Sequence, residues 1–371
     1  MQEWEIIDTT LREGEQTPGV LFSLEEKRLI LDGLVKVGVS EVELGISSRF
    51  HPCSGQLIAH SRRAHPGLRL SLWSRCREED IFFAAEHKPD ILSLSIPVSD
   101  IHLEKRLQKN RDWAYRTMCA ALDSARRHGL TVAIGFEDAT RSDLRFLKTM
   151  AKAAERHGAV RIRLADTVGI GSPRLIGALV TSIKGELKRC RLAVHTHNDF
   201  GMATANAIAA LEAGAHSADT VVLGLGERTG CARLEEVAAY LCLVKNNSKL
   251  RSAYLKPLAR YVAAITGKAI EGNRPILGED IFTCETGLHL QGLQNDPQTY
   301  EAFAPEKVGA RRKLMIGAKS GRRAIMTHLA GLESKPTDNL SELAVQAVRE
   351  TAARLRRPLS DGEFRRLVSE S

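Results

Sequence analysis

Short, mostly apolar segments alternate with longer amphipathic segments along the first two thirds of the chain. The apolar segments have the length and β-rich composition of strands, whereas the longer segments carry apolar residues at helical spacing. The predicted strands span residues 4–11, 41–46, 69–76, 91–97, 131–138, 160–167, 191–198 and 217–225. The predicted helices include residues 23–37, 110–128, 142–157, 173–187 and 202–213.

Glycines mark the ends of several of these helices. Gly38, Gly129, Gly158 and Gly214 each lie between a helical segment and the next predicted strand. Glycine in this position commonly ends a helix. About eight strand–helix units over roughly 250 residues predict a TIM (β/α)8 barrel. A doubly wound open sheet is the alternative, but the first predicted strand is not followed by the GxGxxG turn typical of that fold.

The alternation stops near residue 255. Pro257 and Gly278 interrupt the pattern, and residues 281–330 mix loops with short elements. Two further amphipathic helices are predicted at residues 339–357 and 361–369. We therefore expect a catalytic barrel over residues 1–255, and a linker with an α-rich C-terminal extension over residues 256–371.

Composition narrows the class of protein. Hydrophobic residues make up 43% and charged residues 26% of the 371 residues, as in ordinary soluble globular proteins. The net charge of +8 suits an anionic small molecule such as a CoA ester. The basic clusters are short and lack interleaved aromatic residues, so no nucleic-acid partner is expected. No apolar run approaches the length of about 18 residues that spans a membrane. Seven cysteines without a CxxC pair fit a reducing compartment, and we expect the cytoplasm.

Polar residues gather where the predicted strands end, which is where TIM barrels carry their active sites. Arg12 and Glu13 follow the first strand, and His195 and His197 end the seventh. A carboxylate can bind a metal ion, and a neighbouring guanidinium can stabilise negative charge developing on oxygen. Two histidines at i and i+2 project to the same face of a strand, so they can hold a divalent ion together with Glu13. The alternatives are a salt-bridged surface turn and a pair of hydrogen-bonded core histidines.

Other strand ends contribute further candidates. Glycines after the eighth strand allow the backbone to approach a ligand closely, and arginines after the third can bind a carboxylate. For the arginines, an ordinary surface role is the equal alternative. These candidates are Arg75, Arg77, Glu137, Asp166, Thr167, Gly224, Gly226 and Glu227.

Four motifs, LREGEQTPG, ADTVG, HTHNDFGMATANAIAALEAGA and GLGERTG, resemble those of the DRE-TIM metallolyases, over residues 4–330. Within that superfamily the chain is similar to the synthases that condense acetyl-CoA with a 2-oxo acid to make homocitrate, isopropylmalate or citramalate. The resemblance implies a divalent metal held by Glu13, His195 and His197. It implies that Arg12 faces the keto oxygen of the oxo acid, and that Thr167 and Gln16 position that substrate.

The segments Glu285–His289 and Asp296–Tyr300 resemble the part of the family that supplies a catalytic His and Tyr to a partner subunit. His289, Tyr300 and Glu137 are thereby implied as proton-transfer groups, and a homodimer with an exchanged C-terminal region is implied as well. The glycine loop with Gly224, Gly226 and Glu227 is assigned to CoA binding or loop closure. The identity of the metal stays open, because Mg²⁺, Mn²⁺, Zn²⁺ and Fe²⁺ all fit a carboxylate with two imidazoles.

The REGEQ form of the first motif resembles homocitrate synthases, and residues 95–100 and 135–141 resemble the nitrogenase-associated type. This implies condensation of acetyl-CoA with 2-oxoglutarate. The alternatives are the same chemistry on another 2-oxo acid, giving citramalate, isopropylmalate or citrate, a lyase, and a non-catalytic metal-binding paralogue.

The chain departs from the family at several positions. Cys231 stands where GERAGN carries Asn, and Cys284 stands where a His is frequent. Ala133 and Gly135 replace an Arg and a Ser that grip the distal carboxylate of 2-oxoglutarate in lysine-pathway homocitrate synthases. Arg77 falls where those enzymes have a substrate-binding His, so we expect Arg77 to take over the distal carboxylate.

Overall fold

The computed structural model describes residues 4–48, 53–285, 289, 292–293, 295–332 and 341–369. The chain divides into two compact units, residues 1–269 and residues 270–371. The predicted boundary at residue 255 is therefore too early. The reason is that helix α9 (Leu255–Thr266) belongs to the first unit, where Leu258 packs closely against Gly33 of helix α1.

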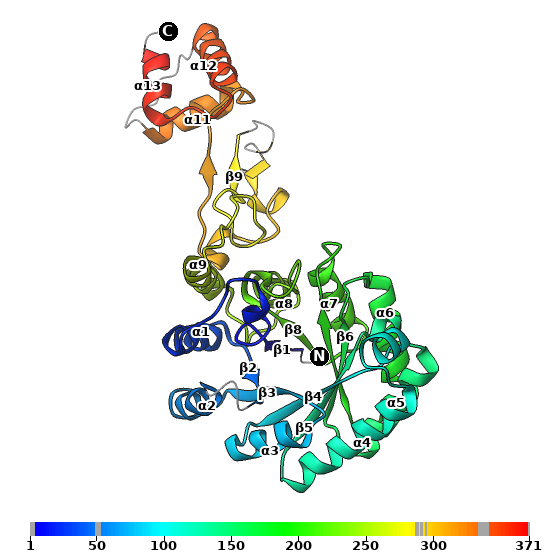
Figure 1. Ribbon diagram of the computed structural model, residues 1–371. Helices are drawn as coiled ribbons and strands as arrows, with labels where there is room; N and C mark the ends of the chain where they lie inside the picture. Colours follow the sequence, from blue (N-terminus) through cyan, green and yellow to red (C-terminus); the bar gives the residue numbers. More distant parts are fainter. Residues whose placement is uncertain are drawn as a thin grey trace. The chain divides into compact units, whose positions relative to one another are not determined.

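The first unit is a closed barrel of eight parallel strands in the order β1 to β8, ringed by helices, which confirms the predicted TIM barrel (Figure 1). The strands are β1 (Glu5–Asp8), β2 (Glu41–Ile46), β3 (Arg69–Arg75), β4 (Ile91–Pro97), β5 (Val132–Glu137), β6 (Arg161–Asp166), β7 (Arg191–Thr196) and β8 (Ser217–Thr220). The helices are α1 (Leu24–Val37), α2 (Cys53–Ala64), α3 (Glu78–His87), α4 (Arg111–Arg127), α5 (Leu144–Arg156), α6 (Pro173–Lys184), α7 (Ala203–Glu212), α8 (Leu234–Leu243) and α9.

Local signals explain where these helices begin and end. Helix α1 begins with a capping box, in which the Ser23 hydroxyl accepts from the backbone of Glu26 and the Glu26 carboxylate accepts in return. It ends at Gly38, whose φ of 94° and close approach to the carbonyl of Lys249 leave no room for a side chain. The four glycines predicted as helix ends all have positive φ. The predicted alternation therefore follows real capping chemistry.

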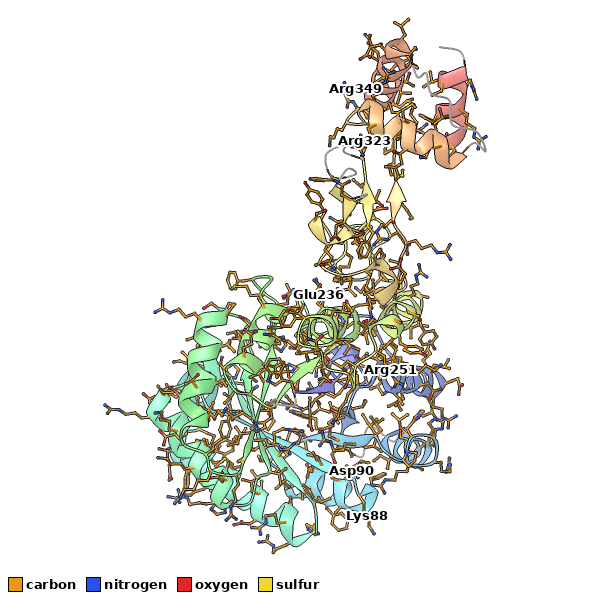
Figure 2. All side chains as sticks on the ribbon, turned by 180° about the vertical axis from the view of Figure 1, so that it is seen from behind. Lys88, Asp90, Glu236, Arg251, Arg323 and Arg349 are labelled. Atoms are coloured by element: carbon orange, nitrogen blue, oxygen red, sulfur yellow. The ribbon has the colours of Figure 1, made fainter. Side chains whose placement is uncertain are left out.

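Contacts between neighbouring helices tie the ring together. Arg251, labelled in Figure 2, donates from its guanidinium to the carbonyl of Val35 at 2.7 Å, which joins the segment before α9 to α1. Glu236 on α8, also labelled, accepts from the hydroxyl of Thr204 on α7 at 2.8 Å. These hydrogen bonds hold the outer helices beside their own strands.

Charged and apolar residues alternate along two opposite strands of the barrel. Glu41 and Glu43 lie on β2, and Arg161 and Arg163 lie on β6, with one apolar residue between the two charged residues of each strand. All four are buried, and they pair across the interior as Glu41 with Arg161 and Glu43 with Arg163. Buried charges are tolerated when they are paired in this way.

The predicted first and last strands are too long at their C-terminal ends. Strand β1 stops at Asp8, and β8 stops at Thr220 instead of residue 225. Beyond these strand ends the two segments of the chain turn toward each other, and the backbone N–H of Val222 donates to the Thr10 hydroxyl at 2.9 Å. The residues that were predicted as strand therefore form hydrogen-bonded turns, and these turns carry residues of the candidate site.

The second unit contains a short parallel pair and three described helices. The pair is β9 (Thr283–Cys284) with β10 (Lys313–Leu314), and the helices are α11 (Arg322–Leu332), α12 (Glu342–Leu355) and α13 (Asp361–Ser369). The helices pack around an apolar core that includes Ile325, Val348 and Phe364. The α-rich extension and its last two helices were predicted correctly.

Candidate active site and metal centre

The turn after β1 buries the first two candidate residues. Arg12 and Glu13 both donate their backbone N–H to the carbonyl of Thr9, which folds the chain back over the barrel mouth. Thr17 secures the turn, because its hydroxyl exchanges hydrogen bonds with the N–H and the carbonyl of Gly226 in the loop after β8. The side chains of Arg12 and Glu13 are only 8% and 3% exposed.

His195 and His197 project from the end of β7 to the same side. Their Nε2 atoms lie 3.2 Å apart, and both residues are buried. Nδ1 of His195 lies 3.0 Å from the carboxylate of Asp219 on β8, which fixes the ring so that Nε2 faces the second histidine. A carboxylate behind a histidine is the usual arrangement around a metal ligand.

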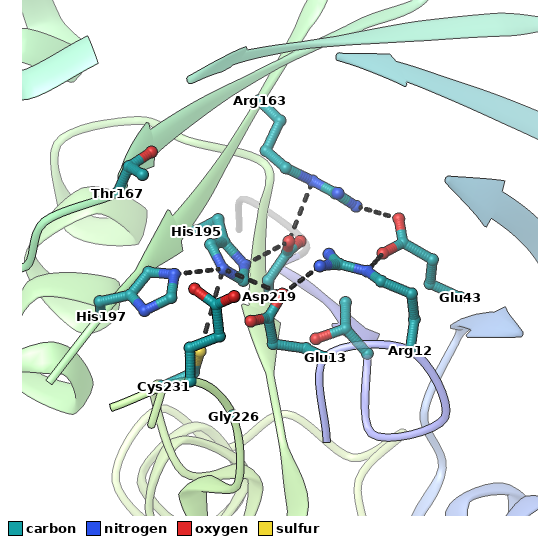
Figure 3. Close-up of polar contacts among 12 residues, drawn as sticks. Arg12, Glu13, Glu43, Arg163, Thr167, His195, His197, Asp219, Gly226 and Cys231 are labelled. Atoms are coloured by element: carbon teal, nitrogen blue, oxygen red, sulfur yellow. Dashed lines mark hydrogen bonds and ion pairs between the residues drawn. The ribbon is translucent and has the colours of Figure 1, made fainter. Parts of the chain in front are cut away.

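Glu13, His195, His197 and Cys231 converge on one point (Figure 3). One potential ligand atom from each lies within 4.8 Å of every other. Among the described residues, Oε1 of Glu13 has no hydrogen-bond partner although it is buried. Buried polar atoms are normally satisfied, so this carboxylate oxygen is suited to bind a cation. One carboxylate and two imidazoles suit a divalent ion, and the predicted metal ligands therefore lie together.

Arg12 lies between two carboxylates. Its guanidinium donates to Glu13 and, through Nε at 2.7 Å, to Glu43. Glu43 also pairs with Arg163 at 2.9 Å, and Arg163 reaches Asp219 behind His195 at 2.9 Å. This network, drawn in Figure 3, connects the arginine to the histidine side of the site.

The electrostatic environment holds these groups in defined charge states. Burial opposes ionisation of Glu43, but Arg163 and Arg12 outweigh it and lower its pKa to about 2. Burial likewise opposes ionisation of Glu13, yet the charge of Arg12 and the two histidines lowers its pKa. Burial, with the neighbouring His195, lowers the pKa of His197 to about 3. A charged carboxylate and a neutral imidazole are the forms that bind metal.

The glycine loop after β8 closes over this cluster. A Cβ at Gly226, where φ is 143°, would lie 3.2 Å from Sγ of Cys231 and 3.4 Å from Cγ of Glu13. Gly224 has φ of 67°, and the loop's Gly230 donates its N–H to the carbonyl of Glu227. The Glu227 side chain is 54% exposed and pairs with Arg228. The glycines therefore serve close packing against the metal cluster.

The remaining barrel candidates occupy neighbouring strand ends. The Thr167 hydroxyl accepts from the N–H of Asp138 at 2.8 Å, and Gln16 is partly buried in the short helical turn after Glu13. Glu137 at the end of β5 accepts from Ser95 at 2.9 Å and from Arg106 at 2.6 Å.

The two arginines at the end of β3 differ in their partners. Arg75 is bound to Asp80 by two hydrogen bonds, of 2.7 and 3.1 Å. Arg77 caps α3, is 59% exposed and lies 3.8 Å from Glu79, a longer and weaker pair. Arg77 is thus the more available of the two cations.

His289 and Tyr300 meet within the second unit. Their rings are in contact, with centroids 4.5 Å apart and planes inclined by 46°, and both line a cavity of about 550 Å³ together with Cys284. Tyr300 is 50% exposed. Residues 286–288 of the corresponding sequence segment lie outside the described residues.

The sequence interpretation missed Glu43, Arg163 and Asp219, which position Arg12 and His195. A signal for two of them was present. Two glutamates lie at i and i+2 in β2, and two arginines lie at i and i+2 in β6. Residues at this spacing share one face of a strand, which for these charged residues is the inward face of the barrel. Asp219 carried no comparable signal.

Comparisons with known proteins identify the family of the chain. Residues 3–262 match the HMGL-like family, and residues 276–356 match the homocitrate synthase post-HMGL domain-like family. The chain is 37% identical over 370 residues to 2-isopropylmalate synthase 2 of Caldanaerobacter subterraneus subsp. tengcongensis, covering 98% of this chain and 95% of the relative. It is 38% identical over 327 residues to homocitrate synthase of Frankia alni, covering 86% and 90% of the two chains.

A putative (R)-citramalate synthase CimA of Archaeoglobus fulgidus is 35% identical over 369 residues, covering 98% of this chain and 74% of that protein. The crystal structure of hydroxymethylglutaryl-CoA lyase from Pseudomonas aeruginosa has a TM-score of 0.65 and 21% identity, covering 72% of this chain and 94% of the lyase. That likeness concerns the barrel fold. None of the helices in the described ranges has the length and apolarity needed to cross a lipid bilayer. The chain belongs to the HMGL-like family of DRE-TIM metallolyases, among the synthases that condense acetyl-CoA with a 2-oxo acid and use a divalent metal.

Proposed function

We propose that the protein condenses acetyl-CoA with 2-oxoglutarate and hydrolyses the product thioester to homocitrate and CoA, as in the nitrogenase-associated homocitrate synthases. The observation that carries the proposal is the convergence of Glu13, His195 and His197 beside Arg12 at the barrel mouth. The match of residues 276–356 to the homocitrate synthase post-HMGL domain-like family supports the choice of product.

Each buried group has a role in this chemistry. A divalent ion held by Glu13, His195 and His197 would polarise the keto group of the oxo acid. Arg12 would donate to the keto oxygen as the enolate of acetyl-CoA attacks and negative charge develops there. Glu43 holds the Arg12 guanidinium through Nε, so the arginine is fixed before the substrate arrives. Gln16 and Thr167 would position the oxo acid.

The choice of 2-oxoglutarate requires a cation for its distal carboxylate. We assign this role to Arg77, because it is exposed and only weakly paired, whereas Arg75 is committed to Asp80. Arginine suits a carboxylate through paired hydrogen bonds. The Arg77→Ala variant should raise the Michaelis constant for 2-oxoglutarate with little change in kcat, and Arg75→Ala is its matched control. An unchanged Michaelis constant would remove Arg77 from the proposal.

Proton transfer is assigned to Glu137, His289 and Tyr300. Glu137 is held at the barrel rim by Ser95 and Arg106, and His289 and Tyr300, whose rings are in contact, line a cavity of the second unit. General acid and base groups of this kind typically contribute about 10²–10⁴-fold. We propose that the second unit supplies His289 and Tyr300 to the barrel of a partner subunit in a homodimer.

Hybrid dimers test this exchange. Arg12→Ala and His289→Ala homodimers should each be nearly inactive. Mixing them under conditions that allow subunit exchange should restore activity, because one site in each hybrid would then contain both wild-type residues. Mass spectrometry verifies that the subunits have exchanged. If activity does not recover in the verified hybrids, each chain completes its own site.

The substrate is tested by measuring CoA release from acetyl-CoA with 2-oxoglutarate, pyruvate, 2-oxoisovalerate and oxaloacetate, with and without a chelator. The proposal predicts release with 2-oxoglutarate, its loss with chelator, and homocitrate as the product identified by mass spectrometry. The similarity to 2-isopropylmalate synthase 2 makes 2-oxoisovalerate the main rival. Activity restricted to 2-oxoisovalerate or pyruvate would replace homocitrate by isopropylmalate or citramalate as the product.

A further inference from the structure

Cys231 places a thiol among the candidate metal ligands. The residue is 2% exposed, and its Sγ lies 3.9 Å from Nε2 of His195. Its backbone forms an antiparallel bridge with His197, so the glycine loop brings the thiol to the end of β7 (Figure 3). A Cβ added at Gly226 would lie 3.2 Å from the same sulfur, so a glycine at this position keeps room for the thiol.

We propose that Cys231 is a fourth protein ligand, binding as a thiolate together with Glu13, His195 and His197. The inference rests on the metal site of the proposed function and deepens it by naming the class of ion. A thiolate is a soft ligand that favours Zn²⁺, Fe²⁺ or Co²⁺, whereas Mg²⁺ and Mn²⁺ prefer oxygen donors. The site therefore selects a thiophilic ion over Mg²⁺.

The distances within the cluster match one shared ion. Ligand nitrogens about 2.1 Å from a tetrahedral zinc lie about 3.4 Å from each other, and a nitrogen and a sulfur lie about 3.6 Å apart. The corresponding distances to Nε2 of His195 are 3.2 Å for Nε2 of His197 and 3.9 Å for Sγ of Cys231. Oε2 of Glu13, the oxygen that also pairs with Arg12, lies at 3.8 Å. The three distances to Nε2 of His195 are therefore within about half an ångström of the tetrahedral values, and the other ligand atoms lie within 4.8 Å of one another.

Two features distinguish Cys231 from a thiol that merely fills space. Its sulfur faces imidazole and carboxylate groups, whereas a packing thiol normally lies among apolar side chains. In addition, the buried Oε1 of Glu13 has no partner within the part of the chain that the structure describes. Cys190 provides the contrast, because it is also buried but its Sγ contacts the carbonyl of Arg191 at 3.7 Å.

Cobalt substitution tests the ligand directly. The protein is stripped with a chelator, loaded with Co²⁺ and examined by absorption spectroscopy, because a thiolate bound to Co²⁺ gives a charge-transfer band in the near ultraviolet. Wild type and the matched control Cys190→Ser should show this band. Cys231→Ser and Cys231→Asn should lose it while keeping the visible d–d bands of Co²⁺ held by the other three ligands.

The outcomes separate the two proposals. If wild type shows the d–d bands without a charge-transfer band, Cys231 is not a ligand, although the three-residue metal site stands. If wild type binds no Co²⁺ at all, the metal site of the proposed function itself fails.

Ion selectivity provides a second measurement that does not depend on turnover. Competition with a chromophoric chelator gives the affinities of wild type and Cys231→Asn for Zn²⁺ and Mg²⁺. Loss of the sulfur ligand should weaken Zn²⁺ binding by at least about tenfold and reduce the preference for Zn²⁺ over Mg²⁺ by a similar factor. An unchanged preference in a variant with wild-type circular dichroism would overturn the inference.

Discussion

The two ends of the barrel interior both bury charged side chains, but they satisfy them differently. At the N-terminal end, Arg161 donates to both carboxylate oxygens of Glu41 at 2.7 Å, so each oxygen of this carboxylate has a partner. At the C-terminal end, Glu13 shares only one oxygen with Arg12, and its other oxygen has no partner among the described residues. In a TIM barrel the first end maintains the fold and the second carries the chemistry. A carboxylate oxygen left without a partner beside two imidazoles is thus the place where a cation can bind.

The largest effect on stability is expected from breaking the Glu41–Arg161 pair. Arg161→Leu leaves the Glu41 carboxylate buried without its main partner, and this should cost about 3–5 kcal/mol of unfolding free energy. Urea denaturation measures the loss. The double variant Glu41→Leu/Arg161→Leu is the control and should recover much of the stability, because no isolated charge remains. A single variant as stable as wild type would contradict a structural role for this end.

At the other end, Arg12→Ala should damage the reaction more than the fold, because Glu43 keeps Arg163 as a buried partner. Removing a preorganised donor to a developing oxyanion lowers kcat by about 10²–10³-fold. Metal content, measured by plasma mass spectrometry, should stay at the wild-type level because Arg12 is not a ligand. Arg12→Lys keeps the charge without the planar fork and should be intermediate. A small change in kcat would exclude Arg12 from transition-state stabilisation.

A smaller effect is expected from Asp219→Asn, which removes the charge behind His195 without replacing a metal ligand. Such substitutions typically lower metal affinity by about 10–100-fold, which equilibrium dialysis against a metal buffer would measure. Glu43→Gln is the control, since it removes charge from the same network without contacting His195. If both variants bind metal equally well, Asp219 does not orient the histidine.

An effect that depends on pH concerns Asp8, at the base of the catalytic turn. Burial raises its pKa to about 7, with the Thr10 N–H opposing and Asp219 adding to the increase. Its folded-state pKa lies above the unfolded value, so the folded protein holds the extra proton between about pH 4 and pH 7. Stability attributable to Asp8 is therefore present at low pH and falls as pH rises, by up to about 1.4 kcal/mol per pH unit. Asp8→Asn should remove this slope in pH-dependent urea denaturation. A wild-type slope in the variant would assign it to another group.

The alternation of apolar and amphipathic segments was sufficient to predict the barrel. All eight strands lie where they were expected, and the glycine caps were read correctly because their signals are local. The ends of β1 and β8 were missed, because Thr10 and Val222 bond across more than 200 residues. Hydrogen bonds between segments that are distant in the sequence do not change the pattern of apolar and polar residues in either segment.

The same distinction applies to the site. His195 and His197 were found through their spacing on one strand, and Glu13 through a motif. Asp219 was not found, because its role depends only on where β8 places it against β7. Cys231 was noticed only as a departure from the family, and its position within the cluster required the three-dimensional structure.

The most direct test of the metal centre is the ion content of purified protein after equilibration with Zn²⁺ and removal of loosely bound metal. Wild type should retain about one ion per chain. The His195→Ala, His197→Ala and Glu13→Ala variants should retain almost none. His216→Ala, at the opposite end of the barrel, should match wild type. Equal retention by all five proteins, each with a wild-type circular dichroism spectrum, would contradict the central claim that these three side chains hold one ion.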